Sequence, residues 1–160
     1  MNILHNKLNH IELRAIQSEK KHYEDVKAVS IEALKIVQRS RGWISDELMR
    51  EIAEVLCISV SQLEEIATFY SQIYRKPVGR HVIKFCDSVV CYMLGCEHIQ
   101  STLETILNIK IGQTTVNNRF TILPISCLGN CDKAPVIMIN DATYSNVNTI
   151  DIPILLEKYK

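Results

Sequence analysis

The sequence carries no excess of charge of either sign and no long apolar run. Its 18 Lys and Arg residues equal its 18 Asp and Glu residues, so the formal net charge is zero. Nucleic-acid-binding chains usually have a basic excess or a basic stripe. The most apolar segments, 55–60 and 152–156, are far shorter than the roughly 20 residues that span a bilayer. We therefore expect protein partners, no nucleic acid and no direct membrane insertion.

The first 21 residues also lack the apolar core of a secretory signal peptide. They contain Glu12 and Glu19, which transit peptides tend to avoid. These features predict a cytoplasmic chain. In a reducing compartment, six cysteines are more consistent with metal binding or redox chemistry than with structural disulfides. The cysteines are therefore the first candidates for a functional site.

Several motifs of known chemistry are missing. The sequence has no G-x-G-x-x-G and no G-x-x-x-x-G-K-[ST] motif, so it offers no readable nucleotide site. It also has no C-x-x-C pair of the thioredoxin redox type. Its five histidines are scattered, without metal-ligand spacing or a triad partner. We assign no catalytic residue to this chain.

The first half of the sequence has the apolar periodicity of helices. Basic residues in front of Gly42 indicate a helix end at that glycine. Ser61 and Glu64 fit a capping box that would begin the last helix of this half. The periodicity predicts helices over residues 9–21, 24–42 and 61–73. Between the last two it predicts a further helix, capped by Ser45 or Asp46, whose core face is Leu48, Ile52, Val55 and Leu56.

The second half alternates strands and helices after a linker at 75–80, which contains Pro77 and Gly79. The alternation suggests a small sheet with helices packed against it. We therefore predict an α+β chain, with an N-terminal helical region over 1–75 followed by a sheet domain over 76–160. Within that domain, strands are predicted over 81–85, 119–126, 136–140 and 142–147, and helices over 92–108 and 151–159.

Two pairs of cysteines stand at the ends of predicted strands. The first pair has the spacing Cys86-x4-Cys91, and the second has the spacing Cys127-x3-Cys131. Paired thiolates at the ends of neighbouring strands can enclose an inorganic core, and four cysteine thiolates are the usual ligands of a [2Fe–2S] cluster. Gly129 allows the second loop to turn tightly beside such a cluster.

Zinc and unliganded thiols are the alternatives. Zinc also takes four cysteines, but structural zinc sites usually hold closely spaced pairs in short ribbons or knuckles. Two further cysteines are left over. Cys57 lies on the apolar side of a predicted helix, so we expect it in the core. Cys96 repeats the x4 spacing after Cys91, but in a helix over 92–108 it would face away from the loop, which predicts a packed thiol.

The same residues resemble a known family. The segments CDSVVC, with Gly95 four residues further on, and CLGNCDKAP are similar to the thioredoxin-like [2Fe–2S] ferredoxins. This family includes the small iron–sulfur subunit of the NADH-dehydrogenase module of respiratory complex I. The first half carries matching segments as well, namely ALKIVQRSRGWIS, IAEVL and EIATFYSQI. The resemblance extends from about residue 22 to the end of the sequence.

The resemblance implies that Cys86, Cys91, Cys127 and Cys131 bind one [2Fe–2S] cluster, and Gly95 supports Cys91 over Cys96 as a ligand. It implies a thioredoxin-like domain that follows three helices. It also implies docking on a flavoprotein subunit that binds FMN and NADH, next to other complex I subunits. The chain would then be an electron-transfer subunit of NADH:quinone oxidoreductase, without activity of its own, and peripheral to the inner membrane through the complex.

Two other interpretations follow from the same residues. Related subunits serve NAD-linked hydrogenases and formate dehydrogenases, so the family alone does not fix the complex. A protein of a different class, a zinc-binding or stand-alone interaction domain without a redox role, is the second alternative. The helical first half favours a docked subunit, because an independent ferredoxin does not need it.

Overall fold

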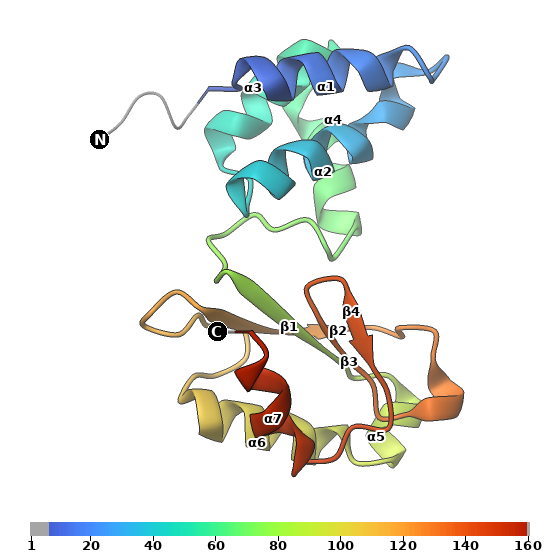
Figure 1. Ribbon diagram of the computed structural model, residues 1–160. Coiled ribbons are helices and arrows are strands. Elements are labelled where there is room, and N and C mark those ends of the chain that lie inside the picture. Colours follow the sequence, from blue (N-terminus) through green and yellow to red (C-terminus); the bar gives the residue numbers. More distant parts are fainter. Residues whose placement is uncertain (1–6, 160) are drawn as a thin grey trace. The chain divides into compact units, whose positions relative to one another are not determined.

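The computed structural model describes residues 7–159, apart from the side chain of Val26. The backbone divides into two compact units between Pro77 and Val78, which we call the helical unit and the sheet unit (Figure 1). In the part of the chain that is described, no helix is both long and apolar enough to cross a membrane.

The helical unit is built on amphipathic helices that share one apolar core. Each of the four α-helices contributes a fully enclosed aliphatic side chain to it, such as Ile16, Leu34, Ile52 and Leu63. The predicted helical N-terminal half is thereby confirmed. Its elements are α1 (His10–Lys20), η2 (Val26–Val29), α2 (Ser30–Arg41), α3 (Asp46–Leu56) and α4 (Val60–Phe69).

The start of α4 differs from the predicted one. Ser59 is the N-cap residue, and its Oγ accepts a hydrogen bond from the backbone N–H of Gln62 at 3.2 Å. The Gln62 side chain accepts in return from the backbone N–H of Ser59 at 3.1 Å, which completes a capping box. The box predicted for Ser61 and Glu64 is therefore wrong. Glu64 instead accepts a hydrogen bond from Nε of Arg75 at 3.1 Å.

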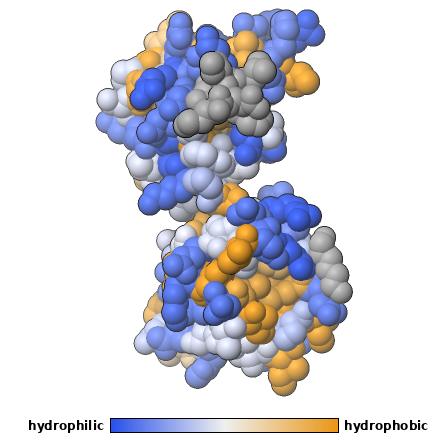
Figure 2. All heavy atoms as spheres, turned by 90° about the vertical axis from the view of Figure 1, so that its left-hand side faces the viewer, coloured by the Kyte–Doolittle hydropathy of each residue, from blue (hydrophilic) through white to orange (hydrophobic). Residues whose placement is uncertain are grey.

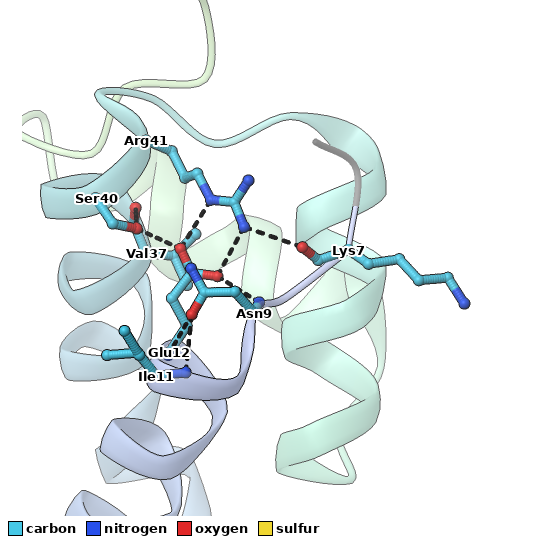
Figure 3. A network of polar contacts seen from close by, with 7 residues as sticks. All are labelled: Lys7, Asn9, Ile11, Glu12, Val37, Ser40 and Arg41. Atoms are coloured by element: carbon cyan, nitrogen blue, oxygen red, sulfur yellow. Dashed lines mark hydrogen bonds and ion pairs between the residues drawn. The ribbon is translucent and has the colours of Figure 1, made fainter. Parts of the chain in front are cut away.

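A buried carboxylate joins α1 to the end of α2 (Figure 3). Glu12 is only 2% exposed, and Arg41 donates to it from Nε at 2.8 Å and from Nη2 at 2.9 Å. The backbone N–H of Asn9 donates to the same carboxylate at 2.8 Å. The hydroxyl of Ser40 donates to it as well. Arg41 also donates to the carbonyl of Lys7. Because a buried charge is tolerated only when it is paired and hydrogen-bonded, this network allows Glu12 to lie inside.

The end of α2 confirms a prediction, whereas the end of α3 contradicts one. Helix α2 ends at Gly42 as predicted, with φ at +84°, a conformation that glycine adopts without strain. Helix α3 ends at Cys57, which also has a positive φ of 56°. The prediction that Cys57 lies in the core is wrong, because this C-terminal capping position leaves its side chain exposed.

The sheet unit contains one mixed sheet with the strand order β2-β1-β3-β4. Strand β1 is parallel to β2 and antiparallel to β3, and β3 is antiparallel to β4. Helices α6 and α7 lie on one face of the sheet (Figure 1). The predicted α+β class is confirmed. The elements are β1 (His81–Cys86), α5 (Val89–Met93), α6 (Cys96–Leu107), β2 (Phe120–Ile125), η3 (Cys131–Lys133), β3 (Ile137–Ile139), β4 (Ala142–Tyr144) and α7 (Asp151–Glu157).

The core of the sheet unit lies between the sheet and these two helices. Alternate residues of β1, Ile83 and Phe85, pack there with Leu103 of α6 and Leu156 of α7. Other apolar side chains of the unit stay in contact with solvent, and Figure 2 shows apolar side chains gathered on one of its faces. The exposed ones in this unit include Ile106, Ile111 and Val116.

The single helix predicted over 92–108 is in fact two helices. Helix α5 ends at Met93, and α6 begins at Cys96. Between them Gly95 has a φ of +91°, outside the range of a right-handed helix. The break changes the direction in which Cys96 points, with consequences for the cysteine site.

Candidate metal centre

The parallel pairing of β1 and β2 brings the two cysteine loops to the same edge of the sheet. Cys86, the last residue of β1, is aligned with Ile125, the last residue of β2. The backbone N–H of Asp87 bonds the carbonyl of Ile125 at 3.1 Å, so the chains stay together past the strand ends. Cys127 follows two residues later. The register of the sheet therefore places the two sequence motifs side by side.

The first cysteine pair is enclosed. Cys86 and Cys91 are each 1% exposed and pack together in one buried cluster. Val136 packs in the same cluster, and its carbonyl accepts a hydrogen bond from the backbone N–H of Cys86 at 3.1 Å. Burial raises the pKa of Cys91 to about 11. Without a metal ion the Cys91 thiol stays protonated at neutral pH, and binding a metal must release its proton.

The second pair lies at the surface. The Sγ atoms of Cys127 and Cys131 are 3.2 Å apart, and the backbone N–H of Gly129 donates to Sγ of Cys127 at 3.3 Å. That hydrogen bond, together with the one from Cys131, lowers the pKa of Cys127. Gly129 has a φ of +78°, so the tight turn predicted at this glycine is present.

The two pairs are neighbours. Hydrogen bonding to Cys127 and burial are the main reasons why the pKa of Cys131 is raised, and the negative charge of Cys86 adds to the effect. Yet among residues 7–159 no three His, Cys, Asp or Glu side chains are arranged around a single metal position. Two adjacent pairs fit a core of two iron ions, whose four ligands are divided between the metals, better than they fit one tetrahedral zinc.

Cys96 is a packed thiol, as predicted, but it lies beside the first cysteine pair instead of facing away from the loop. Because α6 starts at Cys96, the side chain turns back and packs with Cys86, Cys91 and Val136 in one buried cluster. It is 4% exposed. Burial raises the pKa of the Cys96 thiol, and the charges of Glu97, Cys86 and Asp87 add to the shift. The sequence contained a signal for this arrangement, since Gly95 interrupts the predicted helix directly before Cys96.

A comparison with protein families matches this geometry. The model of the family described as thioredoxin-like [2Fe–2S] ferredoxin matches residues 16–160. The chain belongs to the thioredoxin-like [2Fe–2S] ferredoxin family. Membership confirms the predicted cofactor, one [2Fe–2S] cluster, and decides against the zinc alternative.

Curated relatives are similar over nearly the full length. The NADH-quinone oxidoreductase E subunit of Buchnera aphidicola subsp. Acyrthosiphon pisum (strain APS) is 59% identical, covering 96% of this chain and 95% of that one. The proteins of the same name from Escherichia coli (strain K12) and Pseudomonas aeruginosa are 57% and 53% identical. They cover 96% and 95% of this chain and 92% of their own lengths. The predicted resemblance to the small iron–sulfur subunit is thereby confirmed.

A solved structure is similar as well. The crystal structure of an NAD+-reducing [NiFe]-hydrogenase contains a chain that superimposes with a TM-score of 0.67 and 25% identity. The superposition covers 79% of this chain but only 22% of that chain. In that protein the same fold is therefore one part of a much longer polypeptide.

Proposed function

We propose that this chain is the electron-transfer subunit of an NADH:quinone oxidoreductase and acts as an oxidoreductase only within that complex. The observation that carries the proposal is the pair of cysteine loops at one sheet edge, in a chain that is 53–59% identical to NADH-quinone oxidoreductase E subunits over nearly its whole length. The equivalent role in an NAD-linked hydrogenase is the alternative. The hydrogenase chain is only 25% identical, which favours the quinone-linked complex.

The ligands in this proposal are Cys86, Cys91, Cys127 and Cys131. A [2Fe–2S] cluster, when bound, takes up and releases one electron at a time. The chain supplies four thiols that lose their protons on binding. The backbone N–H of Gly129, which donates to Sγ of Cys127, can stabilise the negative charge of that ligand sulfur.

The chain needs a partner that carries a flavin. NADH gives up a hydride, whereas a [2Fe–2S] cluster accepts single electrons, so a flavin must stand between them. The sequence has no nucleotide-binding motif of its own. We therefore assign FMN and NADH to a flavoprotein subunit, and we assign this chain to the cytoplasmic side of the inner membrane, held there through other subunits of the complex.

The test begins with protein purified without oxygen. We expect a red-brown colour that dithionite bleaches, about two iron and two sulfide ions per chain, and an electron paramagnetic resonance signal in the reduced state. NADH alone should leave the spectrum unchanged, and adding the purified flavoprotein should let NADH bleach it. A colourless protein with stoichiometric zinc would overturn the cluster. Reduction by NADH without a partner would overturn the assignment of the flavin to another subunit.

A further inference from the structure

Cys127 and Cys131 form a pair of thiols that solvent can reach. Cys127 is exposed and Cys131 is half-buried. Their Sγ atoms are 3.2 Å apart and already in contact. A bond between two sulfur atoms requires that the side chains approach each other in this way. Joining these two residues would therefore need only a small movement of their side chains.

The backbone around this pair is held by contacts within the sheet unit. Helix η3 begins at Cys131 and ends at Lys133, whose carbonyl accepts a hydrogen bond from the backbone N–H of Asn146 at 2.7 Å. On the other side of the pair, Gly129 turns the chain with a φ of +78°. Its backbone N–H donates to Sγ of Cys127 at 3.3 Å. The contact between the two thiols is thus built into the loop.

The other four cysteines do not combine exposure with a neighbouring thiol. Cys86, Cys91 and Cys96 are between 1% and 4% exposed, so a molecule in solution does not reach their sulfur atoms. Cys57 is exposed, but it is the only cysteine of the helical unit. Thiol–disulfide exchange requires an accessible sulfur, and its completion within one unit requires a second thiol nearby. Only the pair in the second loop meets both conditions.

We propose that Cys127 and Cys131 are a thiol–disulfide exchange site of the cluster-free chain, where a small disulfide in solution is reduced and an intrachain disulfide forms. Cys127 attacks first, because it is exposed and the N–H of Gly129 stabilises the negative charge of its sulfur. Its thiolate displaces one thiolate from the small disulfide RSSR and forms a mixed disulfide. The sulfur of Cys131 then attacks Sγ of Cys127 and displaces the second thiolate. In total, two protein thiols and RSSR give one protein disulfide and two RSH.

This exchange controls loading of the cluster. Only a thiolate binds metal, so the disulfide withdraws two of the four proposed ligands. A dithiol reductant returns them by the reverse exchange. While it lasts, the disulfide also keeps both sulfurs from irreversible oxidation to the sulfonic acid. The control of loading rests on the ligand set of the proposed function, whereas the exchange itself rests on the geometry of the pair.

The test uses the full-length, cluster-free chain carrying Cys57→Ala, so that no exposed cysteine remains outside the pair. The probe is hydroxyethyl disulfide, which is small and uncharged. Mass spectrometry of proteolytic peptides follows each cysteine over time. Cys131→Ser should accumulate the mixed disulfide at Cys127, and Cys127→Ser should react roughly tenfold more slowly. The matched control Cys96→Ala removes a buried thiol and should leave the rate unchanged.

We expect one disulfide, between Cys127 and Cys131, and no modification of Cys86, Cys91 or Cys96. The oxidised chain should take up iron and sulfide only after treatment with dithiothreitol. Equal reaction of the buried thiols and the pair would overturn the exchange site and leave the proposed function intact. So would a mixed disulfide at Cys127 that persists while Cys131 is present. An oxidised chain that loads a full cluster without reduction would overturn the control of loading, together with the assignment of this pair as ligands.

Discussion

Arg41 holds both carboxylate oxygens of Glu12 across 29 positions of sequence, with Nε 2.8 Å from Oε1 and Nη2 2.9 Å from Oε2. The pair ties the first turn of α1 to the last turn of α2. Burial on its own raises the pKa of Glu12, but the hydrogen bonds from Arg41, Ser40 and Asn9 outweigh it, and the pKa is lowered. Such a two-point contact is geometrically specific as well as strong.

Removing the charge of Glu12 should destabilise the helical unit. In Glu12→Gln the guanidinium of Arg41 is left without its counter-ion, and losing one partner of a buried pair costs about 3–5 kcal/mol. The matched control is Glu32→Gln, which breaks the exposed pair between Glu32 and Lys35 (2.8 Å) and should cost no more than about 0.5 kcal/mol. Urea unfolding followed by the fluorescence of Trp43 measures both. Similar unfolding free energies for the two variants would contradict the role given to the buried pair.

The stability of the sheet unit should depend on pH through His81. Burial and then the charges of Arg80 and Arg119 lower the pKa of His81 below its ordinary value of 6.5. The side-chain oxygen of Asn140 accepts from the N–H of Val82, so its Nδ2 faces Nδ1 of His81 at 2.9 Å and donates to it. Protonation at Nδ1 would remove this acceptor.

The direction of this pH dependence follows from how many protons the folded and unfolded chains bind. Because the folded pKa is the lower one, the unfolded chain binds more protons, and stability falls as pH drops from about 6.5 towards the folded pKa. We expect His81→Phe, which keeps a ring beside Phe120 and Tyr159, to unfold with a smaller pH dependence between about pH 5 and 7 than the unmodified chain. Denaturation of both proteins at several pH values measures this difference. Parallel curves would show that His81 does not titrate in this window.

Elements determined by local sequence are predicted closely. The strands before the cysteines are predicted over 81–85 and 119–126 and observed over His81–Cys86 and Phe120–Ile125. Runs of β-branched and aromatic residues indicate such strands without knowledge of their neighbours. The cysteine spacing and the resemblance likewise supply the proposed ligand set, although the ligand assignment itself stays a prediction.

The predictions from sequence fail where a distant residue or the backbone conformation determines the local structure. Both Ser59-x-x-Gln62 and Ser61-x-x-Glu64 fit a capping box, but the structure forms the first one, and Glu64 bonds Arg75 instead. Burial of a charged residue such as Glu12 requires a partner 29 positions away, which no local pattern indicates.

The contacts of the cysteine site were likewise not predictable from local sequence. Whether Cys96 faces the cysteine loops depends on a positive φ at Gly95. Val136, which packs with Cys86, Cys91 and Cys96, comes from a segment far along the chain, and no motif identifies this contact. The exposure of apolar side chains in α5, such as Val89 and Met93, could not be predicted either, because an apolar run in a sequence looks the same whether it is buried or exposed.

The choice of ligand between Cys91 and Cys96 can be tested directly. Both are buried beside Cys86, but the family resemblance, with Gly95 four residues after the second cysteine, assigns Cys91 and not Cys96 as the ligand. We expect Cys91→Ala to lose the cluster and Cys96→Ala to keep it. Iron content and electron paramagnetic resonance of the reduced proteins measure the outcome, and Cys57→Ala, in the helical unit, serves as a control. A normal signal in Cys91→Ala with none in Cys96→Ala would exchange the two assignments.

Removing the iron should loosen only the sheet unit. All four proposed ligands lie between Cys86 and Cys131, and the core of the helical unit is formed entirely by residues up to Ile73. Since metal binding contributes to the stability of the structure that holds its ligands, loss of the cluster releases the constraint on the loops that follow β1 and β2. Hydrogen exchange of the iron-free protein should therefore be faster over residues 80–159 and unchanged in α2 and α3. An equal loss of protection in both units would show instead that they unfold as one cooperative structure.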